Sequence, residues 1–132
     1  MILCNARDWI GTPWHHNQKL KGHGVDCVRF IEAVFKDGLG IEFGNVDSYA
    51  RMPDGDSLLL FLKGLKYIKQ IPLTDKQPGD ILLFRIGKIP YHVGICNGSG
   101  MIHADNRFGV VEIDNLGRWD QRLIAGFRFI FD

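Results

Sequence analysis

The chain has no excess of charge of either sign, because its 132 residues include 16 Lys and Arg against 15 Asp and Glu, for a net charge of +1. Without a broad basic field, nucleic acid is not an expected partner. No apolar run is long enough to span a bilayer, and residues 1–8 lack the basic and apolar regions of a signal peptide. We therefore expect a chain that is cytoplasmic as synthesised and has no membrane span.

Cysteine is scarce as well, and the three residues, Cys4, Cys27 and Cys96, are widely spaced. An odd and scattered set argues against a disulfide framework and suits a reducing compartment. The sequence also has no C-x-x-C or H-E-x-x-H spacing, no repeat, no linker and no low-complexity tract. At this length, with 45% hydrophobic residues, it predicts one domain over residues 1–132 with a real core.

What is present is a helical pattern that begins at a cysteine. Apolar side chains recur at the spacing of one helix face at Cys27, Phe30, Ile31, Val34 and Phe35, and glycines at 38 and 40 mark the end. A thiol in the first turn lies near the positive end of the helix dipole and near unpaired N–H groups, which stabilise the thiolate. The pattern favours a reactive thiol, and the alternative is that Cys27 only packs in the core.

A predicted hairpin supplies a base for this thiol. Residues 91–96 alternate in character, Asn97-Gly98 is a two-residue turn signal, and residues 101–104 return. A two-residue loop places His92 opposite His103, with Cβ atoms about 5 Å apart. A four-residue loop keeps both on the same face of the sheet, whereas a three-residue loop separates them. His92 then suits a catalytic base that His103 orients, and a structural histidine pair is the alternative.

Weaker patterns predict the remaining elements. They are a helical stretch around Cys4, whose side chain we expect to pack, helices over 46–52 and 57–65, and strands over 67–71, 80–85, 109–113 and 125–130. The cluster of Lys19, Lys21 and His23 predicts a solvated loop, with contact to an anionic polymer as the alternative. The 106–109 segment and Trp119 predict a surface turn and a packed aromatic, or the lining of one end of a cleft.

Four segments occur in the order found in NlpC-type cell-wall cysteine peptidases, and the chain resembles that family over nearly its whole length. The segments are Asp26-Cys27, Pro78 to Phe84, His92-Val93-Gly94-Ile95 and Ile102-His103-Ala104. The segment Trp9 to Trp14 is similar to the phage-associated and gene-transfer-agent branch. The resemblance implies a papain-like α+β fold, with N-terminal helices, including the cysteine helix, packed on an antiparallel β-sheet. It also implies that Cys27 is the nucleophile, His92 the base and His103 the third polar residue.

The resemblance further implies a substrate, the peptide stems of bacterial peptidoglycan. The thiol would attack an amide carbonyl, and His92 would protonate the leaving amine and then activate water, so that no metal or cofactor is needed. It implies substrate contacts at Trp14, Asp26 and Val28, with Asp26 recognising a free amine on the stem. Asp26 also suits a helix N-cap. This chain has Val28-Arg29 where the family usually has a small pair such as Ser-Gly.

Other interpretations of the same residues stay open. A zinc site of Cys27, His92, His103 and Asp105 has plausible ligands without a zinc-motif spacing. Cys96 shares the face of His92 and is an alternative thiol, although no helix dipole acts on it. A non-catalytic phage tail or peptide-binding component of the same fold is a different functional class, and an acyltransferase or thioesterase would use the same Cys-His pair. Delivery on a phage tail or tail-like particle would bring a chain without a signal peptide to the wall.

Overall fold

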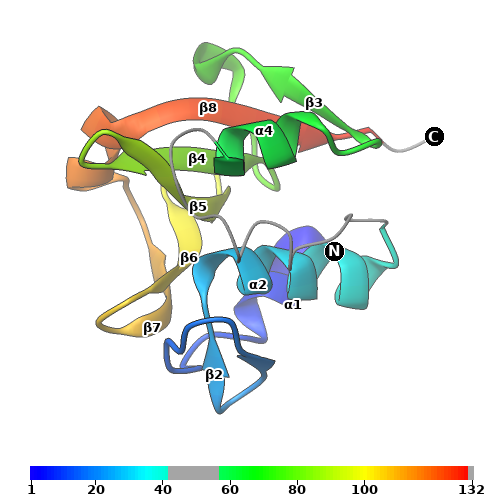
Figure 1. Cartoon of the computed structure of the whole chain (residues 1–132), viewed down its shortest axis with the longest axis vertical. Coiled ribbons are helices and arrows are strands. Elements are labelled where there is room, and N and C mark those ends of the chain that lie inside the picture. Colours follow the sequence, from blue (N-terminus) through cyan, green and yellow to red (C-terminus); the bar gives the residue numbers. More distant parts are fainter. Residues whose placement is uncertain (42–56, 131–132) are drawn as a thin grey trace.

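The computed structural model describes residues 1–41 and 57–130, and the helix predicted over 46–52 lies outside them. Short helices pack against an antiparallel sheet in an α+β arrangement (Figure 1). The helical elements are α1 (Ile2–Arg7), α2 (Cys27–Glu32), the π-helical turn η1 (Ala33–Asp37), α4 (Ser57–Lys63) and the 3-10 turns η2 (Leu73–Asp75) and η3 (Gly117–Arg122). No helix of the described residues is long and apolar enough to cross a membrane.

The main sheet has six strands in the order β3-β8-β4-β5-β6-β7, and every neighbouring pair is antiparallel. Their bounds are β3 (Ile68–Ile71), β4 (Ile81–Ile86), β5 (Ile89–Cys96), β6 (Met101–Asp105), β7 (Gly109–Ile113) and β8 (Leu123–Phe129). Each strand predicted from alternation is confirmed, with its ends within two residues of the prediction. A separate hairpin joins β1 (Lys19–Leu20) and β2 (Gly24–Val25).

The two faces of the sheet carry different clusters, because side chains alternate along each strand. On β4, Ile81 and Leu83 belong to the large core that includes the residues of α2. Leu82 and Phe84 belong to a smaller cluster on the other face, which the segment around η3 covers through Leu116 and the partly buried Trp119. The sheet is therefore buried on both sides at its centre.

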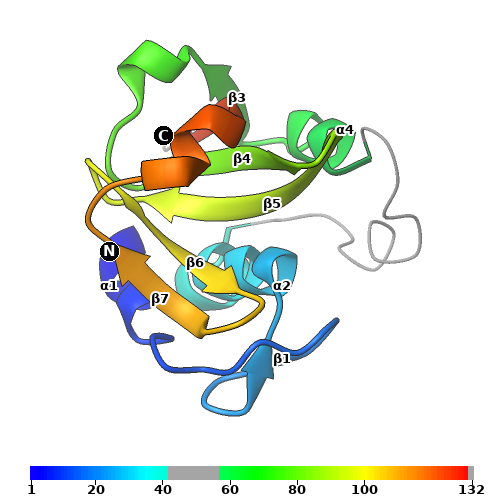
Figure 2. The same ribbon diagram turned by 90° about the vertical axis from the view of Figure 1, so that its left-hand side faces the viewer.

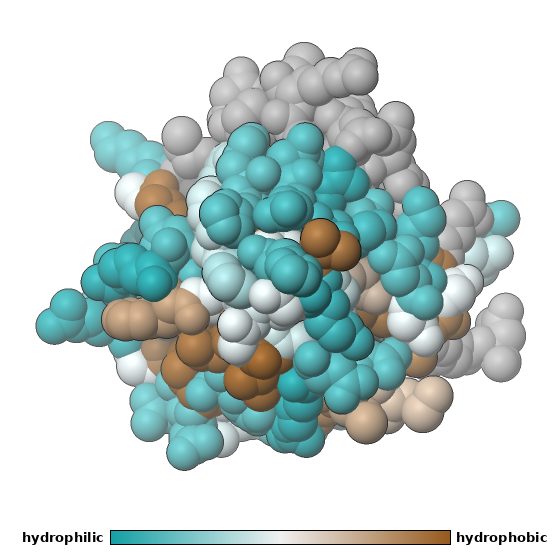
Figure 3. Space-filling model, turned by 90° about the horizontal axis from the view of Figure 1, so that it is seen from below, coloured by the Kyte–Doolittle hydropathy of each residue, from teal (hydrophilic) through white to brown (hydrophobic). Residues whose placement is uncertain are grey.

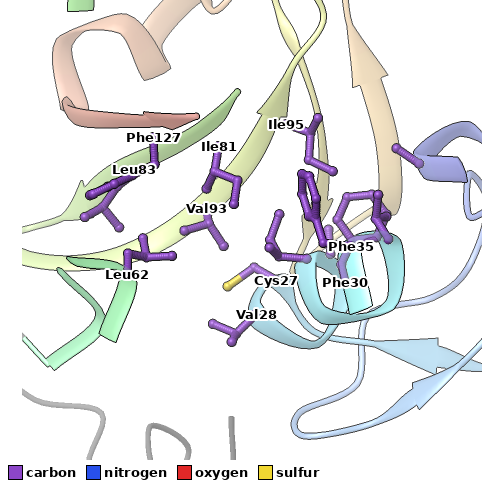
Figure 4. Packing of buried hydrophobic residues seen from close by; sticks show 14 of the residues in the cluster. Cys27, Val28, Phe30, Phe35, Leu62, Ile81, Leu83, Val93, Ile95 and Phe127 are labelled. Carbon is purple, nitrogen blue, oxygen red and sulfur yellow. The ribbon is translucent and has the colours of Figure 1, made fainter. Parts of the chain in front are cut away.

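The cysteine helix α2 begins where the sequence predicts it, at Cys27, and packs against β5 and β6. A helix of six residues is too short to be stable alone, so its contacts with the sheet hold it. Phe30 and Phe35 are fully buried, and each such side chain contributes about 2 kcal/mol through burial. Figure 4 shows Cys27 at the edge of this core, between these two rings on one side and Val93 on the other.

The segment before the β1–β2 hairpin is held from two sides. The backbone N–H of Val110 in β7 donates to the Thr12 carbonyl at 2.9 Å, and the N–H of Val25 in β2 donates to the Pro13 carbonyl at 3.0 Å. These bonds fix the chain on both sides of the position at which Trp14 follows. Trp14 is thereby held next to the start of α2, since β2 leads directly into that helix.

One minor prediction is wrong and another is correct only in part. Cys4 lies on α1 as expected but is exposed and does not pack. Lys21 and His23 lie in an exposed turn, as predicted, whereas Lys19 is a strand residue. Its Nζ pairs with the carboxylates of Glu32 at 2.9 Å and Asp37 at 2.8 Å. Glu32 is only 4% exposed, so this ion pair fastens the β1–β2 hairpin to the end of α2.

The surface seen from below in Figure 3 is mostly hydrophilic, and its hydrophobic residues lie in small separate groups. Exposed large hydrophobic side chains of the described residues include Ile10, Leu20 and Phe108. Scattered apolar residues of this kind are ordinary on protein surfaces. These side chains do not by themselves indicate a binding surface.

A substitution at Gly109, the first residue of β7, can test how closely the N-terminal segment packs against this strand. It has φ +75°, and a Cβ there would meet the Thr12 carbonyl. We expect Gly109→Ala to lower the free energy of unfolding by about 2 kcal/mol or more, through backbone strain and this contact. Gly87→Ala is the matched control, because Gly87 has φ +63° with open space around a Cβ. Urea denaturation measures both, and equal losses would contradict the role of the Thr12 contact.

Candidate active site

The β5–β6 hairpin differs from the prediction in the length of its loop. Cys96 pairs with Met101 and Ile95 with Ile102, so the loop has four residues, 97–100, and the two-residue loop is wrong. The Asn97 side chain closes it, because Oδ1 accepts the Gly100 N–H at 2.7 Å and Nδ2 donates to Glu112 at 2.8 Å. The change is by two residues, so it shifts the pairing and leaves His92 and His103 on one face.

The two imidazoles are joined directly by a hydrogen bond. His92 Nε2 lies 2.8 Å from His103 Nδ1, and both rings are buried, with 6% and 1% exposure. Gly94 makes room for this approach, because a Cβ at Gly94 would meet the Met101 sulfur and lie 3.2 Å from the His103 Cβ. Since Nε2 of His92 is engaged, Nδ1 is the ring nitrogen that remains for exchange of a proton with a thiol.

Cys27 reaches the same place from the other side of the sheet. Beyond the two paired positions, β6 runs at an angle to β5, as Figure 2 shows. The Cys27 thiol donates to the carbonyl of Tyr91, the residue before His92, with an Sγ–O distance of 3.7 Å. The thiol of Cys27, on the helix side, thus contacts the backbone of β5 at Tyr91, and the next residue of the strand is His92, whose imidazole lies on the opposite side.

A cavity of about 350 Å³ contains the thiol and the first imidazole together. The residues that line it are Trp14, Cys27, Ile86, Tyr91, His92, Ala104, Asp105, Asn106, Arg107, Trp119 and Arg122. Ala104 belongs to the helix-side core, whereas Trp119 packs on the other face. The cavity therefore opens where β5 and β6 diverge, and it can admit a substrate to both catalytic candidates.

The electrostatics of Cys27 differ from the sequence expectation. Burial is the main cause, and the neighbouring Asp26 carboxylate a smaller one, that raises the pKa of Cys27 to about 12. The backbone amides of Val93, Val28 and Cys27 act in the opposite direction and are outweighed. The N–H groups at the helix start thus act in the predicted direction, but burial outweighs them, and the net shift favours the protonated thiol.

The histidine pair is neutral in the folded protein. Burial lowers the pKa of both His92 and His103 well below their ordinary value, and the charge that His103 can carry lowers that of His92 further. The Asp105 carboxylate raises both values without overcoming burial. Burial therefore favours the thiol form of Cys27 and the neutral forms of both imidazoles.

The remaining predicted substrate contacts are placed differently from one another. Trp14 lines the cavity. Asp26 is the N-cap of α2, because Oδ1 accepts the Arg29 N–H at 2.8 Å and Oδ2 accepts the Asn17 N–H at 2.6 Å, and it lies outside the cavity lining. Val28 is 4% exposed, lies in the core beside Cys27, as Figure 4 shows, and is not among the residues that line the cavity.

The alternative in which the 106–109 segment and Trp119 line one end of a cleft agrees with the structure for Asn106, Arg107 and Trp119. Trp119 also packs in the smaller cluster, so both interpretations of this residue hold. Arg122, on η3, was not predicted. Its place depends on how η3 folds back over the end of β5, which no periodic pattern encodes.

The two alternative chemistries find little in the structure. Cys96 is buried in the smaller cluster, where its Sγ accepts the Gly98 N–H at 3.4 Å, and it lies outside the cavity lining. Within residues 1–41 and 57–130, no three His, Cys, Asp or Glu side chains converge as a metal ion would require.

A comparison with protein families decides the assignment. The model of the NlpC/P60 family matches residues 11–128. This chain belongs to the NlpC/P60 family. The match includes Cys27, His92 and His103, and it runs from the segment before the cysteine helix to the last strand.

Relatives of this NlpC/P60 chain are named as endopeptidases. It is 31% identical over 114 residues to a Haemophilus influenzae protein named probable endopeptidase, which covers 84% of this chain and 62% of that protein. It is 28% identical over 111 residues to the Escherichia coli murein DD-endopeptidase MepS/murein LD-carboxypeptidase, covering 83% of this chain and 51% of the other. The chain thus spans less than two thirds of the length of these curated relatives.

Solved structures confirm the papain-like α+β fold. The NlpC/p60 domain of the peptidoglycan hydrolase SagA has a TM-score of 0.68 at 23% identity, covering 97% of this chain and 96% of that one. An NlpC/P60 family protein from Bacillus cereus has a TM-score of 0.72 at 22% identity, covering 98% of this chain and 39% of the other. At such identities the likeness shows the shared fold.

The neutral histidines make the stability of this NlpC/P60 chain depend on pH. Their folded-state pKa values lie below the unfolded value of about 6.5, so the unfolded chain binds more protons as the pH falls through 6.5. The free energy of unfolding is therefore unaffected by titration of these histidines above about pH 6.5. It falls as the pH drops from 6.5 toward 5, by up to about 1.4 kcal/mol per pH unit for each histidine. Thermal melts from pH 7 to 5 should show a shallower slope for His92→Asn. His23→Asn, an exposed histidine, should keep the wild-type slope, and equal slopes for the two variants would contradict the expectation.

The protonated thiol makes a second pH-dependent prediction. Below its raised pKa, the thiolate fraction of Cys27 rises about tenfold per pH unit, and the alkylation rate follows it. We expect the rate of iodoacetamide labelling at Cys27 to rise steadily from pH 7 to 9.5 without a plateau. The measurement uses peptide mapping in a Cys4→Ser background, which removes the exposed thiol. A plateau near neutral pH would show a stable thiolate and contradict the result.

Proposed function

We propose that the protein is a cysteine peptidase that hydrolyses amide bonds in the peptide stems of bacterial peptidoglycan, with Cys27, His92 and His103 as its catalytic residues. One observation carries the proposal. His92, which is hydrogen-bonded to His103 at 2.8 Å, lines the same cavity as Cys27, the first residue of α2. The names of the relatives, which include endopeptidases and a peptidoglycan hydrolase, supply the substrate class.

In the acylation step, the Cys27 sulfur forms a bond to the amide carbonyl while the thiol proton passes to His92 Nδ1. Because the resting thiol is protonated, transfer to the base has to accompany the attack rather than precede it. The thiol therefore leaves the Tyr91 carbonyl and turns toward the imidazole when an amide enters the cavity. The N–H of Cys27, at the start of α2, is the first candidate donor to the developing oxyanion.

The leaving amine takes the proton from His92 when the carbon–nitrogen bond breaks. His92 then removes a proton from water while the water oxygen attacks the thioester carbonyl. The carbon–sulfur bond breaks, the proton on His92 passes to the sulfur, and the new carboxylate leaves as the Cys27 thiol is regenerated. His103 supports both steps through Nδ1, which accepts the His92 Nε2–H and thereby requires the His103 proton on its own Nε2. This role explains why the third polar residue can be an imidazole.

The resemblance of residues 9–14 to a phage-associated branch concerns delivery rather than chemistry. Association with a phage tail or tail-like particle that acts at the wall stays a prediction from that segment alone. An acyltransferase or thioesterase would use the same thiol and imidazole, and the fate of the acyl group separates these activities from hydrolysis.

Digestion of purified muropeptides tests the proposal. We expect cleaved stem peptides by mass spectrometry, and incorporation of ¹⁸O from labelled water into the new carboxylate. Cys27→Ala should lower the rate by about 10³-fold or more, because no other group in the cavity can form the thioester. His103→Ala should lower it by about 100-fold, whereas His103→Asn should retain more activity because its Oδ1 can accept the His92 proton donor.

Cys4→Ser is the matched control, since this cysteine is exposed on α1 and should leave the rate unchanged. Folding of each variant is checked by its thermal melt. A folded wild-type protein that cleaves no type of stem peptide would contradict the proposal. Cleavage that survives Cys27→Ala would equally contradict the assigned nucleophile.

A further inference from the structure

We propose that Trp119 is a positioning residue for the catalytic base, holding the His92 ring in the plane that serves both His103 and Cys27. The inference rests on the proposed function, in which His92 is that base. Trp119 lies on η3, between β7 and β8, far from the three catalytic candidates in the sequence. It deepens the proposed mechanism by adding a residue that acts through His92 and forms no bond with the substrate.

The indole makes three aromatic contacts that together define its place. It stacks on His92 with ring centres 4.6 Å apart and an angle of 22° between the planes. Its edge meets His103 at 5.5 Å and 76°, and Phe84 at 5.3 Å and 68°. Trp119 therefore touches both members of the hydrogen-bonded pair and a fully buried ring of the sheet.

Stacking on Trp119 restricts a rotation of the His92 ring that the hydrogen bond to His103 alone permits. A single bond from Nε2 to His103 still permits the His92 ring to rock about its side-chain torsions. A flat ring stacked on the imidazole opposes rotation out of the stacking plane and so keeps Nε2 in line with His103. Precise placement matters because a misplacement of about 1 Å at a reacting group can cost about 100-fold in rate.

The indole also covers the pair from water. His92 lines a cavity that opens to solvent, yet it and His103 are almost fully buried, and the Trp119 ring contacts each of them. A hydrogen bond shielded in this way is stronger and more directional than one that water can replace. Loss of the cover should therefore loosen the pair even when the fold is intact.

The support of Trp119 is itself rigid. Phe84 is fully buried on β4 and pairs with His92 on the neighbouring strand β5, so the indole packs on a buried ring directly beside the base. The Arg122 guanidinium lies over the same indole, 5.4 Å from its centre. The ring is thus held by packing from the sheet and by a cation, which explains how a short 3-10 turn can hold it in place.

Several charged and titratable groups line the cavity beside His92 or bond to it. They are Cys27 from α2, His103 and Asp105 from β6, Arg107 from the β6–β7 turn, and Arg122 from η3. None of these residues is replaced in a Trp119 variant, but the Arg122 guanidinium lies over the indole and loses that contact when the ring is removed. A change in the titration of His92 that occurs in Trp119→Leu and not in Arg122→Gln therefore reports the cover and placement of the ring.

The experiment compares Trp119→Phe with Trp119→Leu. Both are smaller apolar side chains that keep the cluster filled, but only phenylalanine offers a ring to stack on His92. We expect kcat for stem-peptide cleavage to fall by about 100-fold in Trp119→Leu with a smaller change in KM, and Trp119→Phe to recover most of the loss. Trp9→Phe is the control, because Trp9 lies outside the cavity lining and contacts Lys21 instead.

A measurement without substrate separates this proposal from the proposed function. NMR of histidine-labelled protein from pH 8 to 5 should show His92 and His103 untitrated in the wild type and in Trp119→Phe. In Trp119→Leu, the midpoint of His92 should move up toward the ordinary value of about 6.5 as water reaches the ring. This result would support the positioning role even if stem peptides prove to be the wrong substrate.

Three outcomes would overturn the inference. One is equal kcat for the Leu and Phe variants. Another is a loss confined to KM with unchanged histidine titration, which would make Trp119 a substrate contact. The third is histidine titration in Trp119→Leu identical to that of the wild type at an unchanged melting temperature.

Discussion

The hydrogen bond between His92 and His103 joins two strands at a level where they no longer pair, and the site depends on it. β5 and β6 form a ladder only next to their loop and then diverge. Where the strands diverge, the two imidazoles join them by a hydrogen bond of 2.8 Å in place of the backbone ladder. A cavity can therefore open between two strands of one sheet while the buried ring nitrogens that join the strands keep a hydrogen-bond partner.

Divergence of two central strands would be costly if it exposed the core, and the fold covers it from both sides. The cysteine helix packs against β5 and β6 on one face. On the other face, the segment around η3 brings Leu116 and Trp119 onto Phe84. The polar pair is thereby enclosed between two apolar layers, and this enclosure keeps both rings neutral. The same layers that stabilise the sheet thus set the protonation state of the site.

The strands and the cysteine helix could be predicted from the sequence because alternation and helical spacing are local properties. The shared face of His92 and His103 could be predicted too, since it depends only on whether the loop is even or odd. The loop length itself could not, because it is decided by the Asn97 side chain, which bonds both to Gly100 and to the distant Glu112. The position of Trp119 and the degree of burial of Cys27 likewise depend on tertiary packing, and that burial outweighs the expected effect of the helix terminus on the pKa of the thiol.

The Tyr91 carbonyl that accepts the Cys27 thiol has a consequence for the lifetime of the protein. Peroxides and other oxidants attack the thiolate, and a thiol that is buried and keeps its proton reacts with them slowly. Chemical damage should then fall first on Cys4, which is exposed and takes no part in the site. Holding the sulfur in this way would preserve it against oxidation during the intervals when no amide occupies the cavity.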